Sequence, residues 1–226
     1  MPYFINKLKQ RIAYKTVKGR GVGIIFIHGL NSDMNGKKAL IVEKYAKNHN
    51  LPFIRFDCRG HGKSFGNFED FTISDWKQDL IDLIDNLTSG PQILIGSSMG
   101  GWLMMLAAKA RRKKVCGLIG LAAAADFDKS LYNSLSIKEK NEIKKKGFTK
   151  HFWNYGSSYI LTKKFFLDAK KNNILKKPLK LSQPIILIHG LRDEVVNHKV
   201  PQKIMSMLTS KKIQIKFLKS SDHRLS

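Results

Sequence analysis

Short apolar runs alternate with longer amphipathic segments along most of this chain. Seven runs have the length and the β-branched, aliphatic or aromatic content of strands, at residues 11–17, 23–28, 53–57, 92–97, 115–121, 184–189 and 212–218. The clearest helix runs from Thr72 to Leu87: Thr72 and Asp75 are spaced for a capping box, and the apolar stripe comprises Trp76, Leu80, Leu83, Ile84 and Leu87. This alternation predicts an α/β fold, a mostly parallel sheet with helices on both faces.

One region breaks the alternation. Residues from about 126 to 179, between two strand candidates, have no regular sequence of strands and helices, which is typical of a lid inserted into a domain. We therefore expect a single domain over residues 1–226 with this insertion as its lid. Most of its aromatic side chains are expected to hold the lid together, while some could form the wall of a pocket for an acyl or aryl group: Phe127, Tyr132, Phe148, Phe152, Trp153, Tyr155, Tyr159, Phe165 and Phe166.

The most informative motif is Gly96-Ser97-Ser98-Met99-Gly100, which lies between an apolar strand and a helix-like segment. In that context a G-x-S-x-G sequence forms a sharp turn that exposes the central serine above the sheet edge. Ser98 is therefore the candidate nucleophile. Ser97 does not fit the motif, because position 95 would have to be glycine and is isoleucine.

A serine nucleophile needs a base, and the base needs a carboxylate that fixes its tautomer. Asp193 follows the buried run 184–189, and His223 follows the last strand candidate, so both lie in loops at the carboxyl ends of strands and in the order acid, then histidine. We predict that they complete a triad with Ser98.

Two backbone N–H groups are expected to bind the oxyanion. One belongs to Met99, directly after the nucleophile, and the other to Leu30, in the loop after the run 23–28. His28 and His189, each directly before a glycine, are expected to be structural, and His151 and His198 lie in no motif.

These residues resemble the α/β-hydrolase family over nearly the whole chain. The matching pieces are His28-Gly29, the segment from Asp57 to Ser64, the nucleophile motif, His189-Gly190-x-x-Asp193, and His223. In detail they are most similar to the small mitochondrial palmitoyl-protein thioesterase and acyl-glucuronide esterase branch and its bacterial relatives. The resemblance implies an α/β-hydrolase fold and hydrolysis of an ester or thioester.

The chain departs from that family in two places. Asn197 stands where the acid loop commonly has proline, which should loosen the loop. Family members normally continue beyond the histidine into a last helix, whereas the printed sequence stops at Ser226, so the domain is expected either to manage without that cover or to be a shortened product.

The sequence Gly60-His61-Gly62-Lys63-Ser64 invites comparison with a phosphate-binding loop. That motif requires a glycine five positions before Gly62, where this chain has Asp57. A structural role or a role at the entrance of the active site fits better, with Asp57 and Arg59 expected to form a local bracing pair.

The net charge of +24 favours anionic partners in general. Lysines are spread through every segment and outnumber arginines 33 to 8, which fits a general compositional bias, and we find no signature of a nucleic-acid-binding fold. The insertion is nevertheless strongly basic, with 14 lysines and 3 acidic residues between positions 129 and 180. We therefore expect preferred substrates to carry a negative group remote from the scissile bond, such as a glucuronate or coenzyme A.

No apolar stretch has the roughly 18 residues of a membrane span. Residues 1–20 are basic like a transit peptide, but 11–17 alternates as the first strand of the sheet would. Cys58 and Cys116 are expected to be free thiols in a reducing compartment, which predicts a cytoplasmic enzyme. We see no metal-ligand spacing and expect no cofactor.

Together these features predict a serine hydrolase. Two alternatives stay open: a small peptidase of the prolyl-oligopeptidase type, although the chain has no room for the gating domain of that family, and a non-catalytic basic binding protein with a degenerate hydrolase site.

Overall fold

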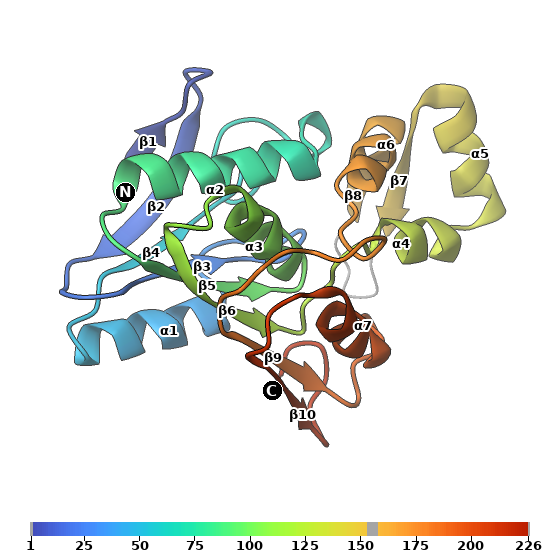
Figure 1. Cartoon of the computed structure of the whole chain (residues 1–226). Coiled ribbons are helices and arrows are strands. Elements are labelled where there is room, and N and C mark those ends of the chain that lie inside the picture. The colour runs from blue at the N-terminus through green and yellow to red at the C-terminus, as the bar shows by residue number, and fades with distance from the viewer. Residues whose placement is uncertain (1, 153–157, 226) are drawn as a thin grey trace.

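A computed structural model describes residues 2–152 and 158–225. Its centre is an eight-stranded sheet in the order β1-β2-β4-β3-β5-β6-β9-β10 (Figure 1). The strands are β1 (Tyr3–Ile5), β2 (Arg11–Val17), β3 (Gly23–Ile27), β4 (Phe53–Phe56), β5 (Gln92–Ser97), β6 (Val115–Leu121), β9 (Ile185–Gly190) and β10 (Ile213–Leu218). The six strands from β4 to β10 are parallel, and β1 and β2 pair antiparallel at one edge.

All seven predicted strands are present, with ends that differ by at most one residue. The expectation that residues 11–17 form the first strand was wrong, because the three-residue β1 precedes them and pairs with them. A strand of only three residues, without an alternating pattern, gives too short a signal to recognise in a sequence.

Helices cover the two faces of the sheet unequally. The larger core lies on the face covered by α2 (Ile73–Leu87), α3 (Met99–Ala110) and α7 (Lys199–Met207), and the smaller core lies under α1 (Lys37–Asn48) on the opposite face (Figure 1). Helix α2 begins as predicted, with Thr72 and Asp75 in a reciprocal capping box. Its side chains Trp76, Leu80, Leu83 and Ile84 are fully buried.

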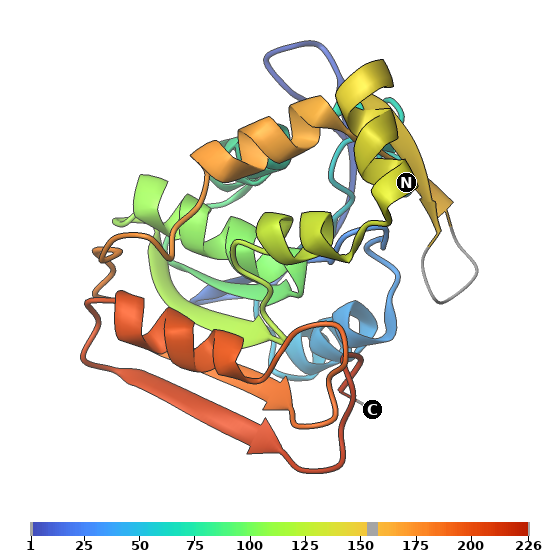
Figure 2. The ribbon, with the colours of Figure 1, turned by 90° about the vertical axis from the view of Figure 1, so that its right-hand side faces the viewer.

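The described residues of the insertion, 126–152 and 158–179, form a separate layer beside α2 and α3 (Figures 1 and 2). This insertion comprises α4 (Asp128–Ser134), α5 (Ile137–Lys146), β7 (Phe148–Phe152), β8 (Ser158–Thr162) and α6 (Lys163–Lys171). Strands β7 and β8 pair antiparallel as a hairpin outside the main sheet. Two of the aromatic residues proposed for the pocket wall, Trp153 and Tyr155, lie outside the described residues.

The insertion is attached to the main body through α6. Asp168 accepts hydrogen bonds from the N–H and the hydroxyl of Ser74 on α2, at 2.8 and 2.7 Å. The indole Nε1 of Trp102 on α3 donates to the carbonyl of Asn172, at 3.1 Å. None of the helices within the described ranges combines the length and the apolar character that crossing a membrane would require.

Candidate active site

Ser98 stands at the turn between β5 and α3 in a backbone conformation that side chains rarely adopt, with φ +52° and ψ −118°. The turn is closed so tightly that a Cβ on Gly96 would overlap the backbone of Gly100, and a Cβ on Gly100 would overlap the carbonyl of Ile27. The two glycines therefore allow β3, β5 and α3 to meet at this point, and the serine lies at the amino end of α3.

The three predicted triad residues come together. His223 Nε2 lies 3.1 Å from Ser98 Oγ, and His223 Nδ1 lies 2.8 Å from Asp193 Oδ2. This geometry suits an imidazole whose Nδ1–H donates to the carboxylate and whose Nε2 accepts from the serine hydroxyl. The Asp193 side chain is fully buried, whereas that of His223 is one-fifth exposed.

Hydrogen bonds prepare Asp193 to act as an anion. Burial alone would raise its pKa, but the pKa is lowered because the carboxylate accepts hydrogen bonds from His223 and from the N–H groups of Val196 and Val195. Parallel strand order explains why residues so far apart in the chain meet. Asp193 follows β9 and His223 follows the neighbouring β10, so both emerge at the same edge of the sheet as Ser98.

The loop that carries Leu30 comes close to Ser98. A Cβ built on Gly29 would lie 3.2 Å from Ser98 Cβ and 3.8 Å from Ser98 Oγ. Leu30 is the next residue, and Met99 is the first residue of α3. Met99 thus directly follows Ser98, and Leu30 lies one residue beyond the closely approaching Gly29, so both stay the predicted oxyanion donors.

Two buried histidines brace this loop. His28 Nδ1 lies 2.7 Å from the carbonyl of Gly29, and its Nε2 accepts from the N–H of Cys58. His61 Nε2 accepts from the N–H of Asn31, at 3.3 Å. Burial lowers the pKa of both rings, to about 3 for His61, where the neighbouring His28 adds to the effect. The sequence placed His61 only in a loop near the entrance and gave no sign of this contact.

The segment from Asp57 to Ser64 wraps around the Asp57 carboxylate, which accepts from the N–H groups of Met34 and Lys63. The expected pairing of Asp57 with Arg59 was wrong. Arg59 Nε instead lies 2.6 Å from Asp79 Oδ1 on α2, and both side chains are buried. Asp57 is occupied by backbone donors, and the arginine reaches away from it to the helix.

The other histidines and the cysteines have no place in the triad. His189 Nε2 lies 2.8 Å from the carbonyl of Val196 and 3.3 Å from Asp193 Oδ2. This ring therefore supports the loop that carries Asp193, which we call the acid loop. His151 contacts Glu139 on the insertion, and His198 immediately precedes α7. Cys58 and Cys116 are both free thiols.

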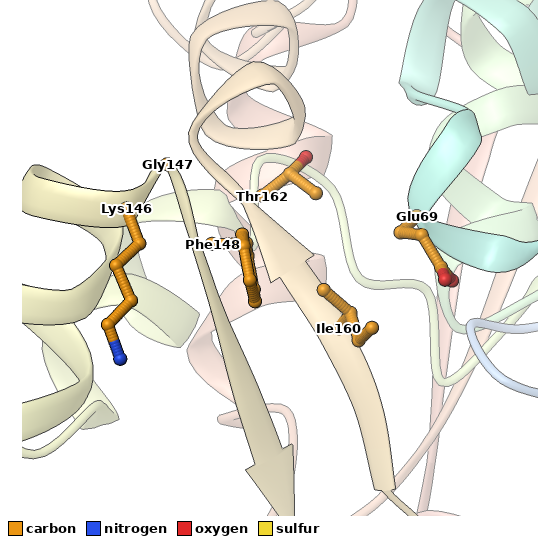
Figure 3. A pocket seen from close by; sticks show the side chains of 6 residues that line it. All are labelled: Glu69, Lys146, Gly147, Phe148, Ile160 and Thr162. Atoms are coloured by element: carbon orange, nitrogen blue, oxygen red, sulfur yellow. The ribbon is translucent and has the colours of Figure 1, made fainter.

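A groove runs between the β7–β8 hairpin and the single turn η1 (Phe68–Asp70). It consists of two adjoining cavities of about 290 and 360 Å³ that share Glu69 and Ile160, and we refer to it as the hairpin groove. Figure 3 shows Phe148 and Ile160 on the hairpin with Glu69 across from them. The second cavity reaches Asn31, next to Leu30. Apolar side chains line the centre of the groove, with Lys146 of α5 and Lys150 of β7 at its border and the carboxylate of Glu69 on the opposite side.

Comparisons with known proteins agree with this fold. The model of the family described as serine aminopeptidase, S33, matches residues 20–150. The mitochondrial palmitoyl-protein thioesterase ABHD10 of Homo sapiens is 40% identical over 220 residues, which cover 95% of this chain and 71% of that protein.

Solved structures give the same result. The alpha/beta hydrolase domain-containing protein 10 from mouse superimposes with a TM-score of 0.90 at 37% identity, covering 99% of this chain and 90% of that one. Est1E from Butyrivibrio proteoclasticus, at 20% identity, has a TM-score of 0.86, covers 100% of this chain and 92% of that one, and shares the fold. The chain therefore belongs to the serine aminopeptidase S33 family of α/β-hydrolases and is a serine hydrolase.

Proposed function

We propose that this enzyme hydrolyses carboxylic esters or thioesters through an acyl-enzyme on Ser98. The observation that carries the proposal is the continuous set of hydrogen bonds from Ser98 through His223 to Asp193. The serine of that set stands on a strained turn at the amino end of a helix, which is where the nucleophile of an acyl-transfer enzyme is expected.

The reaction takes two steps. Ser98 Oγ attacks the acyl carbonyl while His223 Nε2 takes its proton, and the N–H groups of Leu30 and Met99 stabilise the oxyanion of the tetrahedral intermediate. When the carbonyl re-forms, the bond to the alcohol or thiol breaks and His223 returns the proton to that leaving group. Water then attacks the acyl-enzyme with His223 as its base, and the acid is released. Asp193 stabilises the imidazolium in both steps.

The acyl group is assigned to the hairpin groove. Its apolar centre suits an alkyl or aryl chain, and it ends next to the loop of Leu30. The related human and mouse proteins are called palmitoyl-protein thioesterases, which supports a long acyl chain on this enzyme as well. Ile160→Lys should raise KM for long-chain acyl thioesters and leave KM for acetyl esters unchanged. An equal change for both chain lengths would place the acyl group elsewhere.

The lysines of the insertion support the preference for an anionic substrate group. Lys150 borders the groove, so a carboxylate or phosphate on the leaving group would be attracted at low ionic strength. Measuring kcat/KM for neutral and anionic acyl donors at low and high salt tests this. Equal values at low salt would remove the idea.

A fluorophosphonate probe tests the catalytic serine directly. The parent enzyme should be labelled and should hydrolyse a short nitrophenyl ester, and Ser98→Ala should lose both properties. Ser206→Ala, an exposed serine on α7, is the matched control and should keep both. Labelling that persists in Ser98→Ala would refute the assignment, and a folded parent that is neither labelled nor active would leave the basic binding protein as the better proposal.

The family description favours one further candidate, a peptidase. A fluorogenic dipeptide amide, assayed beside a thioester, separates the two activities. The predicted cytoplasmic location rests on the two free thiols and stays a prediction, since the curated mammalian relatives are named as mitochondrial.

A further inference from the structure

The histidine loop, residues 219–225, carries the base of the proposed triad, and its position determines the distance from His223 to Ser98. Some of its contacts come from the neighbouring acid loop: the N–H of Arg192 donates to the carbonyl of Ser221, and Asp193 accepts from the imidazole. These contacts hold the histidine loop relative to β9. They do not tie it to β5, the strand that presents the nucleophile.

Lys38 supplies that connection from another element. Its Nζ lies 3.1 Å from Ser97 Oγ and 3.4 Å from the backbone carbonyl of His223. Lys38 is the second residue of α1, on the face of the sheet opposite α2 and α3. A single ammonium group therefore touches both the residue next to the nucleophile and the backbone of the residue proposed as its base.

The chemistry of the contact requires a donor. Both partners of Nζ offer oxygen lone pairs, and an ammonium has three N–H groups and no acceptor. Partial burial lowers the pKa of Lys38, while the carboxylates of Asp193 and Asp222 act in the opposite direction. The two carboxylates, on the acid loop and the histidine loop, therefore partly offset the cost of burying the ammonium.

We propose that Lys38 is a positioning residue, which fixes the distance between Ser98 and His223 by linking the nucleophile strand to the histidine loop. The inference rests on the proposed function, since it assumes that Ser98 and His223 react as a pair. Without the link, the imidazole would still bind Asp193 but would move relative to the hydroxyl. Misplacement by about 1 Å can cost on the order of 100-fold in rate.

The test compares Lys38→Met, which keeps the length of the side chain and removes its donors, with Lys37→Met. Lys37 is the adjacent, exposed lysine of α1, so this control removes one charge from the same turn. With a short neutral ester, Lys38→Met should lower kcat by about 10- to 100-fold with little change in KM. Lys37→Met should match the parent, and Lys38→Arg, which keeps a cationic donor, should recover most of kcat.

Stability measurements separate positioning from folding. Thermal unfolding of each variant gives the folded fraction at the assay temperature, and kcat is expressed per folded enzyme. If Lys38→Met does not fold, Ser97→Ala carries the test, because it removes one end of the link and should also lower kcat.

Two results would overturn the proposal: a folded Lys38→Met with the kcat of the parent, or a rise in KM alone. If Lys38→Met does not fold, a Ser97→Ala variant with the kcat of the parent would overturn the proposal. Failure of the proposed function would look different, because the parent itself would then be inactive and unlabelled by the fluorophosphonate.

Discussion

His61 should make the protein lose stability in mildly acidic solution. The ring is 6% exposed and its Nε2 accepts from the N–H of Asn31, beside the loop of Leu30. Only the neutral ring offers a lone pair at Nε2, since both nitrogens of a protonated imidazole are donors. Protonation would therefore break the contact and place a charge among the rings of His28, Phe68 and Trp76.

The size of the effect follows from the shift in pKa. Burial lowers the pKa of His61 from 6.5 to about 3. Because the folded-state pKa is the lower one, this contribution to stability is complete above pH 6.5 and is lost as the pH falls toward 3. At pH 5 the unfolded chain holds nearly one more proton at this site than the folded chain, which costs about 2 kcal/mol relative to pH 7.5, and the full difference near pH 3 is about 5 kcal/mol.

Urea unfolding followed by tryptophan fluorescence at pH 7.5 and pH 5.0 measures this loss. His61→Gln is the informative variant, because its amide oxygen can accept from Asn31 and its side chain does not titrate. The other histidines remain in both proteins, so the difference between the two pH dependences reports on His61 together with its effect on the neighbouring His28. The parent should lose about 2 kcal/mol more than His61→Gln between the two pH values. An equal loss in both proteins would refute the reasoning.

Three further predictions concern single substitutions. Gly29→Ala puts a methyl 3.2 Å from Ser98 Cβ, so the loop must shift, and kcat for a short ester should fall about 10- to 100-fold, whereas an unchanged kcat would contradict the close approach. Arg59→Met leaves the buried Asp79 without its cation and should lower the free energy of unfolding in urea by about 3–5 kcal/mol. The double variant Arg59→Met, Asp79→Leu should recover much of that loss. Asp193→Asn should lower kcat by about four orders of magnitude because the imidazole loses its oriented tautomer, and a fall of less than tenfold would argue against the triad.

The sequence could locate the proposed triad because topology does most of the positioning. Ser98, Asp193 and His223 each follow an apolar run, and strands in a parallel sheet end at a common edge. To predict that the three residues lie close together, it was therefore enough to assign the three apolar runs to strands of one parallel sheet. The glycines of the nucleophile turn added a local requirement that is also visible in the sequence.

Side-chain partners in the loops could not be predicted in this way. Asp57 and Arg59 are two positions apart and opposite in charge, yet Arg59 pairs with Asp79 because the loop directs its guanidinium toward α2. The contact of Lys38 with His223 spans 185 positions and depends on where α1 lies under the sheet. The β7–β8 hairpin was missed because its short strands lie in a region that breaks the regular alternation.

The attachment of the insertion bears on how the proposed triad could stay fixed beside the proposed acyl groove. Helix α6 is bound to the main body by half-buried hydrogen bonds, from Ser74 to Asp168 and from Trp102 on α3 to Asn172. On the hairpin, by contrast, Phe148, which lines the groove, and Phe152 are about half or more exposed. The opposite face of the hairpin is anchored by the buried side chains of Thr149, Tyr159 and Leu161, so adjustment to a ligand is expected from the exposed side chains and not from the strands themselves. Acyl groups of different length should therefore be accommodated by movement of these exposed side chains, while the α6 contacts keep α3, and with it Ser98, in place.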